Sequence, residues 1–495
     1  MNQKNPVCVR FAPSPTGSTH LGSGRTALYN YLLARQTDGK FILRIEDTDQ
    51  KRYVPGVEKE LIDSLHWLGI DWDEGPGIGG PHAPYRQSER REIYQEYARK
   101  LIEAGHAYYC FCSPERLETV RKEQLSRKEN PRYDGLCRRL DPGEAQARVS
   151  NGERHVVRFK IPESGSVTVH DLIRGDITVE NSALDDYVLI KSDGLALYHL
   201  AAMVDDHLMG ITHVIRGSEW LSTFPLHVQI INAFGWQEPQ WVHLSVFLKP
   251  SGKGKMSKRD ASQLIKDGHS IFIKDLETLG YIPEGVVNWV ALMGWSYDDR
   301  TELFSMRDLI DKFNLAHLNP SPAAINFTKL DYFNGLHIRN LTREDLAHRL
   351  APYVAIAGYQ FDEDRLYRAI PIIRERLVTL DDVIPVAGFF FKDVVTANPN
   401  DLIGDDLTPA ESVKVARKAY EILVSLPQIN KDLAEPPMRN LVEELALTAG
   451  QVFGILRVAV TGQKVSPPLF ESMEIIGKDK VLERIQSAID ALEKM

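Results

Sequence analysis

The sequence predicts an α/β protein with an all-helical C-terminal part, and three observations support that class. Residues 7–32 have the pattern of a buried strand, a tight loop and a helix. Residues 40–45 form a second short apolar stretch, which is followed by charged side chains. After residue 270 the composition becomes helical. Short apolar strands followed by helices are typical of an open α/β sheet.

The first loop, residues 10–26 with the sequence RFAPSPTGSTHLGSGRT, begins the candidate site. Pro13, Pro15 and Gly17 exclude regular structure and force a turn before the helix. A loop that ends at a helix N-terminus presents N–H groups and the positive end of the helix dipole, which favour a phosphate. On these residues alone, a tight turn without a ligand is the alternative.

The second predicted strand, residues 40–45, ends beside Arg44, Glu46 and Asp47. Ligands of an open α/β sheet bind beyond the carboxyl ends of its strands. We therefore expect Arg10 and Glu46 to face one crevice. An ion pair between these two side chains inside the protein is the alternative.

Composition restricts the class of protein. The chain has 495 residues, of which 43% are hydrophobic and 26% charged, as in a soluble globular protein of about three domains. The N-terminus has no signal pattern, and the most apolar stretch, residues 286–295, is too short to cross a bilayer. Four cysteines do not suggest a disulfide framework. We expect a cytoplasmic protein that does not bind a membrane.

The net charge of −9 excludes a protein that coats nucleic acid by bulk charge. Residues 116–139, however, hold eight Lys and Arg against four acids, and residues 249–259 hold five and no acid. Each basic segment is either a solvated face or a local contact for nucleic acid.

Three cysteines form a third group of candidate residues. Cys110 and Cys112 make a C-x-C pair, and Cys137 follows 25 residues later. This spacing is compatible with zinc, with three reduced cysteines as the alternative. Residues 155–191 then contain short β-type segments separated by turn residues, which predicts an inserted subdomain.

The second loop of interest is residues 250–259, with the sequence PSGKGKMSKR, directly after a predicted strand end. Its two glycines permit movement, and its three lysines and one arginine make it cationic. Such a loop can close over a triphosphate and balance the charge of leaving pyrophosphate. A basic surface loop or a general RNA contact is the alternative.

Two strings, HLGS at residues 20–23 and KMSKR at residues 255–259, together resemble the two signatures of class I aminoacyl-tRNA synthetases. RFAPSPTGSTHLG, RIEDTD at residues 44–49 and YHLAAMVDD at residues 198–206 resemble the bacterial glutamyl-tRNA synthetase family in particular. The resemblance covers most of the chain and is strongest in residues 7–50 and 198–260.

The resemblance implies a Rossmann-type catalytic domain with an inserted α+β connective domain, followed by an all-α anticodon-binding region. It divides the chain into a first catalytic half, a connective domain that holds the acceptor stem of tRNA, a second catalytic half, a helical stem-contact region and the anticodon-binding domain. The expected boundaries are residues 1–109, 110–197, 198–260, 261–335 and 336–495.

The resemblance also implies the reaction of a glutamate–tRNA ligase. Glutamate and ATP give glutamyl-adenylate and pyrophosphate, and the glutamyl group then passes to the 3′-terminal adenosine of tRNA-Glu. The family uses Mg²⁺ with the phosphates and needs tRNA to activate its amino acid. We expect a monomer, and whether tRNA-Gln is also charged stays open.

Site residues follow from the matched motifs. The expected catalytic residues are His20, Lys255 and Lys258. For glutamate, Arg10 is the first choice as partner of the side-chain carboxylate, Arg216 is the second, and Glu46 suits the α-ammonium. The full expected glutamate set is Arg10, Ala12, Ser14, Glu46, Tyr198, Ala202 and Arg216; the family often has Asn where Ala202 stands. The expected ATP set is His20, Gly22, Ser23, Glu219, Lys255, Met256, Ser257, Lys258 and Arg259.

The family's last zinc ligand lies two residues after the third cysteine, where this chain has Arg139, which cannot ligate. A related short enzyme uses a tyrosine instead, so Tyr133 becomes the fourth expected ligand. The candidate zinc set is Cys110, Cys112, Tyr133 and Cys137.

Three rival functions share part of this pattern. A glutamine-specific relative has both signatures but typically carries β-barrel anticodon domains. A non-catalytic RNA-binding descendant of a synthetase would be expected to lose one signature. A small-molecule nucleotidyltransferase would be shorter and would lack the KMSKR loop. Adenylate formation that depends on tRNA separates the first function from all three.

Overall fold

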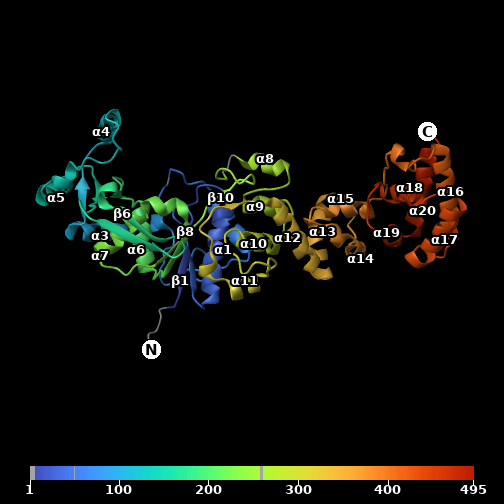
Figure 1. Ribbon diagram of the computed structural model, residues 1–495, viewed down its shortest axis with the longest axis horizontal. Helices are drawn as coiled ribbons and strands as arrows, with labels where there is room; N and C mark the ends of the chain where they lie inside the picture. Colours follow the sequence, from blue (N-terminus) through green and yellow to red (C-terminus); the bar gives the residue numbers. More distant parts are fainter. Residues whose placement is uncertain (1–5, 50, 257–259, 360) are drawn as a thin grey trace. The chain divides into compact units, whose positions relative to one another are not determined.

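The computed structural model describes residues 6–49, 51–256, 260–359 and 361–495 (Figure 1). Ser257, Lys258 and Arg259, which the sequence assigns to ATP, lie outside the described residues. The chain divides into two compact units. The first contains residues 1–276 and 286–327, and the second contains residues 277–285 and 328–495.

The strands all come from the first unit. They are β1 (Cys8–Phe11), β2 (Lys40–Leu43), β3 (Ala107–Cys110), β4 (Val156–Phe159), β5 (Ser166–Asp171), β6 (Gly175–Glu180), β7 (Val188–Ile190), β8 (His213–Gly217), β9 (Gln240–Leu244), β10 (Phe247–Leu248) and β11 (Ala323–Ala324). The helices up to residue 312 are α1 (Leu21–Gln36), α2 (Val57–Trp67), α3 (Arg91–Glu103), α4 (Pro114–Ser126), α5 (Pro142–Ser150), α6 (Tyr198–Leu208), α7 (Phe224–Phe234), α8 (Ala261–Lys266), α9 (Ile273–Thr278), α10 (Pro283–Ala291) and α11 (Met306–Lys312).

Parallel pairing dominates the centre of the first unit. Strands β8, β9 and β5 are parallel neighbours, and β6 closes the sheet as an antiparallel hairpin on β5. Strand β1 pairs in parallel with β2, and the Thr212 N–H beside β8 donates to the Cys8 carbonyl in β1 at 2.8 Å. The α/β class predicted from the sequence is confirmed.

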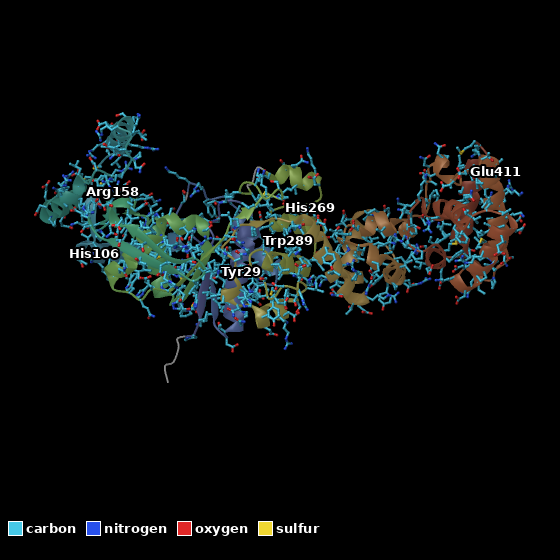
Figure 2. All side chains as sticks on the ribbon, in the orientation of Figure 1. Tyr29, His106, Arg158, His269, Trp289 and Glu411 are labelled. Carbon is cyan, nitrogen blue, oxygen red and sulfur yellow. The ribbon has the colours of Figure 1, made fainter. Side chains whose placement is uncertain are left out.

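Helix α1 follows the Pro- and Gly-containing loop, as the sequence predicts. It begins at Leu21, with His20 as its N-cap, and its buried face packs inside the first unit. The Tyr29 hydroxyl donates to the carbonyl of Ala291 at 2.9 Å, and Trp289 from α10 is buried in the same unit (Figure 2). These contacts fix α1 at both its loop end and its middle.

A smaller antiparallel sheet has the order β3-β4-β7, and its strands lie between β2 and β8 in sequence. Helix α4 begins at Pro114, because the Ser113 side chain accepts from the Arg116 N–H and Pro114 occupies the first turn. The hairpin of β5 and β6 instead joins the sheet of β8 and β9 through β5.

The second unit has no strand among its described residues. Its helices after α12 (Phe327–Asn340), which spans the boundary, are α13 (Arg343–Ile356), α14 (Glu363–Ile373), α15 (Val383–Ala387), α16 (Pro409–Ser425), α17 (Lys431–Glu444), α18 (Ala449–Thr461), α19 (Leu469–Ile476) and α20 (Lys478–Leu492). Four apolar side chains at helical spacing are buried in α20, namely Val481, Ile485, Ile489 and Leu492. Within the described part of the chain, every helix is too short or too polar to cross a membrane.

Candidate active site

A cavity of about 610 Å³ opens where β1, β8 and the N-terminus of α1 meet. Its walls come from segments that are far apart in sequence, residues 10–26, 198–220 and 245–256. The sequence-predicted residues that line it are Arg10, Ala12, Ser14, His20, Gly22, Ser23, Glu46, Tyr198, Arg216, Glu219, Lys255 and Met256. Ala202, also expected at the glutamate site, is fully buried in α6 and does not line this cavity.

The first turn of α1 forms one wall. The Gly22 N–H donates to His20 Nδ1 at 3.0 Å, and the N–H groups of Ser23 and Gly24 donate to the His20 carbonyl at 2.9 and 3.0 Å. The sequence assigns Gly22 and Ser23 to ATP, and in this structure their N–H groups and that of Gly24 bond to His20 within the turn. What this wall offers an anion is the positive end of the helix dipole.

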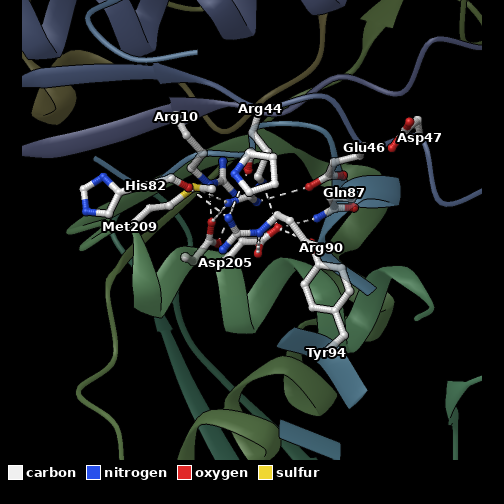
Figure 3. A network of polar contacts seen from close by, with 12 residues as sticks. Arg10, Arg44, Glu46, Asp47, His82, Gln87, Arg90, Tyr94, Asp205 and Met209 are labelled. Carbon is white, nitrogen blue, oxygen red and sulfur yellow. Dashed lines mark hydrogen bonds and ion pairs between the residues drawn. The ribbon is translucent and has the colours of Figure 1, made fainter. Parts of the chain in front are cut away.

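A network of buried charges lies beside the cavity, and two of its members, Arg10 and Glu46, line it (Figure 3). Arg10 donates to both oxygens of Asp206, at 3.0 Å from Nε and 3.3 Å from Nη2. Arg44 joins Asp206 at 2.8 Å to Glu46 at 3.1 Å. The ion pair between Arg10 and Glu46 considered from the sequence is therefore not formed, because each has another partner. The Nη1 group of Arg10 takes no part in the pair with Asp206.

Asp205 belongs to the same network and accepts three hydrogen bonds from side chains. It accepts from Arg90 Nε at 2.8 Å, from the Tyr94 hydroxyl at 2.8 Å and from Gln87 at 2.9 Å. Three guanidinium groups thus balance three carboxylates: Arg10, Arg44 and Arg90 against Glu46, Asp205 and Asp206. Removal of one member leaves a buried charge without its partner, which costs roughly 3–5 kcal/mol.

The carboxyl group of Glu46 has a raised pKa within this network. Burial raises the pKa of its carboxyl group to about 7, although Arg44 and Arg10 act in the opposite direction. A substrate cation beside Glu46 would favour the ionised form. Glu46 is therefore suited to receive an ammonium group.

Arg216, at the end of β8, has a different environment. Its guanidinium donates to His243 Nε2 and contacts His227 Nδ1, both at 3.0 Å, and it donates to the Tyr198 hydroxyl at 3.2 Å. Among the described residues no carboxylate forms a hydrogen bond or ion pair with it. Within the described part of the site, Arg216 thus has no paired anion, whereas Arg10 has Asp206.

The second loop is described as far as Met256. The Met256 N–H donates to the Phe247 carbonyl at 2.9 Å, and the Lys249 N–H donates to the Gly254 carbonyl at 3.0 Å. These bonds fold the base of the loop back on β10. Lys255 and Met256 consequently line the same cavity as His20.

Arg25 is a lining residue that the sequence prediction missed. It lies in α1 and is 4% exposed. It donates to the carbonyls of Met293, at 2.8 Å, and Ser245, and its guanidinium lies 4.1 Å from the centre of the Phe247 ring. An arginine in the middle of the apolar positions of a helix was the available signal.

Trp220 was missed as well. Its ring stacks on Tyr198 with the centres 3.9 Å apart, and both side chains line the cavity. The stacked pair gives the cavity a flat aromatic surface beside Arg216.

The cysteine cluster brings three thiols and one phenol close together. The sulfur atoms of Cys110, Cys112 and Cys137 all lie within 4.8 Å of one another, and Cys112 Sγ is 3.5 Å from Cys137 Sγ. The Tyr133 hydroxyl is 3.5 Å from the sulfur atoms of both Cys110 and Cys112. Two tetrahedral thiolate ligands of zinc are about 3.8 Å apart. The donor set and its spacing therefore fit a zinc ion.

Comparison with known families places the chain. The family model "tRNA synthetases class I (E and Q), catalytic domain" matches residues 6–332, and the model "Anticodon binding domain" matches residues 345–489. The chain belongs to the class I tRNA synthetases of this E and Q family.

Relatives cover the full length. A glutamate–tRNA ligase of Dehalococcoides mccartyi is 44% identical over 99% of both chains. One of Borreliella burgdorferi is 43% identical over 98% of both chains. The crystal structure of a glutamate tRNA ligase from Elizabethkingia meningosepticum in complex with its amino acid superimposes with a TM-score of 0.91 and 36% identity, covering 99% of this chain and all of the other.

Proposed function

We propose that this chain is a glutamate–tRNA ligase. It joins L-glutamate to ATP, releases pyrophosphate and transfers the glutamyl group to the 3′-terminal adenosine of tRNA-Glu. The observation that carries the proposal is one cavity that contains a guanidinium without a paired carboxylate, Arg216, and a buried carboxylate, Glu46. These charges complement the two ends of glutamate. The full-length similarity to glutamate–tRNA ligases supports the same function.

Arg216 is the proposed partner of the substrate side-chain carboxylate. No described carboxylate pairs with it, and its planar guanidinium can present two parallel donors. Arg10 contributes its uncommitted Nη1 group, which reverses the order of preference expected from the sequence. Glu46 receives the α-ammonium. Tyr198, Ala12 and Ser14 complete the pocket, while Ala202 acts only through packing.

ATP occupies the part of the cavity between α1 and the second loop, named here the lysine loop, of which residues 250–256 are described. His20, Gly22 and Ser23 lie on one side, and Lys255, Met256 and Glu219 lie on the other sides. The α-carboxylate of glutamate attacks the α-phosphorus in line, so the protein supplies position and charge balance. Lys255 balances charge on the leaving pyrophosphate together with Lys258 and Arg259, and Ser257 contacts ATP, as the KMSKR string implies. Mg²⁺ accompanies the phosphates.

Specificity for glutamate over glutamine is favoured by two features. A guanidinium without a paired anion gains more from a carboxylate than from a neutral amide. The described residues of the second unit are helical, whereas the glutamine-specific relatives typically have β-barrel anticodon domains. We propose a cytoplasmic monomer with one zinc at the cysteine cluster and five domains bounded as the sequence predicts.

The direct test is aminoacylation with labelled amino acids. Purified enzyme with ATP and tRNA-Glu transcript is expected to form glutamyl-tRNA and to give glutamate-dependent pyrophosphate exchange only when tRNA is present. Labelled glutamine under the same conditions is expected to give no product. Glutaminyl-tRNA as the main product would contradict the proposal, and a parallel assay with tRNA-Gln determines whether that tRNA is charged with glutamate.

A further inference from the structure

Arg216 is held by a chain of imidazoles that no step of the proposed reaction uses. Beyond His243 and His227, this series of hydrogen-bonded groups continues on both sides. His243 Nδ1 lies 2.7 Å from Asp171 Oδ2, and His227 Nε2 lies 2.9 Å from His199 Nδ1. Asp171, His243 and His227 have no exposed surface.

The hydrogen bonds assign the protons in this chain. An imidazole nitrogen accepts a hydrogen bond only when it carries no proton, so the other nitrogen must carry it. The carboxylate of Asp171 accepts the Nδ1 proton of His243, which leaves Nε2 as an acceptor for Arg216. His199 Nδ1 accepts the Nε2 proton of His227 in the same way. Burial lowers the pKa of His243 to about 4 and that of His227 well below its usual value, so both are neutral at pH 7.

Asp171 cannot turn away from His243, because backbone groups fix both of its oxygens. Oδ1 accepts the N–H groups of Ile173 and Arg174 at 3.0 Å each, and Oδ2 also accepts the N–H of His243 at 2.9 Å. Asp171 ends β5 beside β9, which carries His243. Two adjacent strands therefore fix the direction in which His243 Nε2 points.

We propose that Asp171 and His243 are positioning residues for recognition of the substrate carboxylate by Arg216. This inference rests on the proposed function. The neutral imidazole orients the guanidinium without pairing with its charge, so the charge is kept for the substrate. A carboxylate at the position of His243 would hold Arg216 equally well, but it would compete with the substrate. An apolar side chain there would leave Arg216 Nε without an acceptor.

The first test is Asp171→Asn. The amide can present its NH₂ group to His243, which favours the other tautomer and removes the acceptor from Arg216. Partners that orient a ligand-binding side chain are typically worth about 10- to 100-fold. The KM for glutamate is expected to rise by about that factor, and the preference for glutamate over glutamine is expected to fall, while the KM for ATP is unchanged.

A second Asp–His pair, between β5 and β6, offers a matched control. Asp176 and His170 form a pair at 2.6 Å between β6 and β5, with both side chains about two-thirds exposed. Asp176→Asn breaks the same kind of pair without touching Arg216. All kinetic constants of this variant are expected to equal those of the unchanged enzyme.

A second pair of variants tests the acceptor itself. His243→Gln keeps an oxygen that Arg216 Nε can use, whereas His243→Leu has a similar size and no acceptor. The glutamate KM is expected to rise much more in the leucine variant. Because Asp171 acts through the imidazole, adding Asp171→Asn to His243→Gln is expected to raise the KM no further.

The outcomes separate this inference from the proposed function. If the unchanged enzyme forms no glutamyl-tRNA, the proposed function is wrong. If it does, and Asp171→Asn has the same glutamate KM as Asp176→Asn, the positioning role is wrong. Asp171→Asn could instead lower the melting temperature and raise the KM for glutamate and the KM for ATP together. In that case the two His243 variants decide: equal glutamate KM values for His243→Gln and His243→Leu would overturn the inference.

Discussion

At the scale of single residues, the site depends on how each charge is paired. Arg10 and Arg216 are both buried guanidinium groups in one cavity, yet only Arg10 has a carboxylate partner, Asp206. The sequence placed Arg10 first because it lies in the N-terminal motif. It could not reveal Asp206, 196 positions away, as the group that pairs with Arg10.

Arg216→Gln tests this distinction. Truncating one partner of a buried charge pair typically costs about 2–5 kcal/mol. The glutamate KM is therefore expected to rise by a factor of roughly 30 to several thousand, while the ATP KM changes little. Pyrophosphate exchange with tRNA present measures both constants. For Arg10→Ala the glutamate KM is also expected to rise, and an unchanged value would remove Arg10 from substrate binding.

The raised pKa of Glu46 predicts a pH dependence. Below about pH 7 the carboxyl group of the free enzyme is protonated and cannot pair with the substrate ammonium. Because glutamate binds the ionised form, kcat/KM for glutamate is expected to fall as the pH decreases from 8 to 6, by up to about tenfold per unit below the pKa. A pH profile at saturating ATP measures the effect, and Glu46→Gln is expected to lower kcat/KM and to remove this dependence.

The free energy of unfolding is expected to depend on pH in the direction opposite to kcat/KM. Between pH 4.5 and 7 the folded protein binds more protons at Glu46 than the unfolded chain does. Its contribution to the free energy of unfolding is therefore present at low pH and decreases as the pH rises through 7. Substrate binding and intrinsic stability thus favour different protonation states of the same carboxyl group.

At the scale of elements, the sequence predicted those whose local signals are strong. Proline and glycine mark the loop before α1, and the helix begins directly after that loop, at Leu21. The first turns of α17 carry weaker local signals. Asn430 caps this helix by accepting from the Leu433 N–H, so it begins at Lys431, and it includes two prolines that obscure the helical pattern.

The packing of α1 against the strand of the lysine loop could not be predicted, because Arg25 reaches carbonyl groups more than 200 positions away. Arg25→Met would leave those buried carbonyls without a donor, at about 1–3 kcal/mol each. The melting temperature is expected to fall, and the ATP KM is expected to rise more than the glutamate KM.

Arg35→Met on the same helix is the matched control. Arg35 is partly exposed and pairs with Asp73 at 2.8 Å, a contact worth about 1 kcal/mol or less. Thermal denaturation and both KM values should stay close to those of the unchanged protein. An equal effect of the two variants would show that Arg25 does not connect α1 specifically to the loop.

At the scale of the whole molecule, the net charge of −9 means that tRNA must be bound through local basic segments. Within residues 116–139 several basic side chains pair with acids, such as Arg116 with Asp134. Five exposed ones have no ion-pair partner among the described residues, namely Arg121, Lys122, Lys128, Arg132 and Arg139. Of these, Arg132 donates to the Ser182 carbonyl. All five charges are available to phosphates.

The cysteine cluster lies at the two ends of this basic segment, since Cys110 and Cys112 precede it and Cys137 lies near its end. Zinc bound there would fix the segment by joining both ends of α4 and the chain that follows it. Elemental analysis is expected to give one zinc per chain. In Cys112→Ser the zinc content is expected to fall, and the KM for tRNA is expected to rise more steeply with salt than in the unchanged enzyme. The glutamate KM should not change, because none of these ligands lines the catalytic cavity. A Cys112→Ser enzyme that has lost zinc but keeps its tRNA KM would show that the metal does not organise the basic segment.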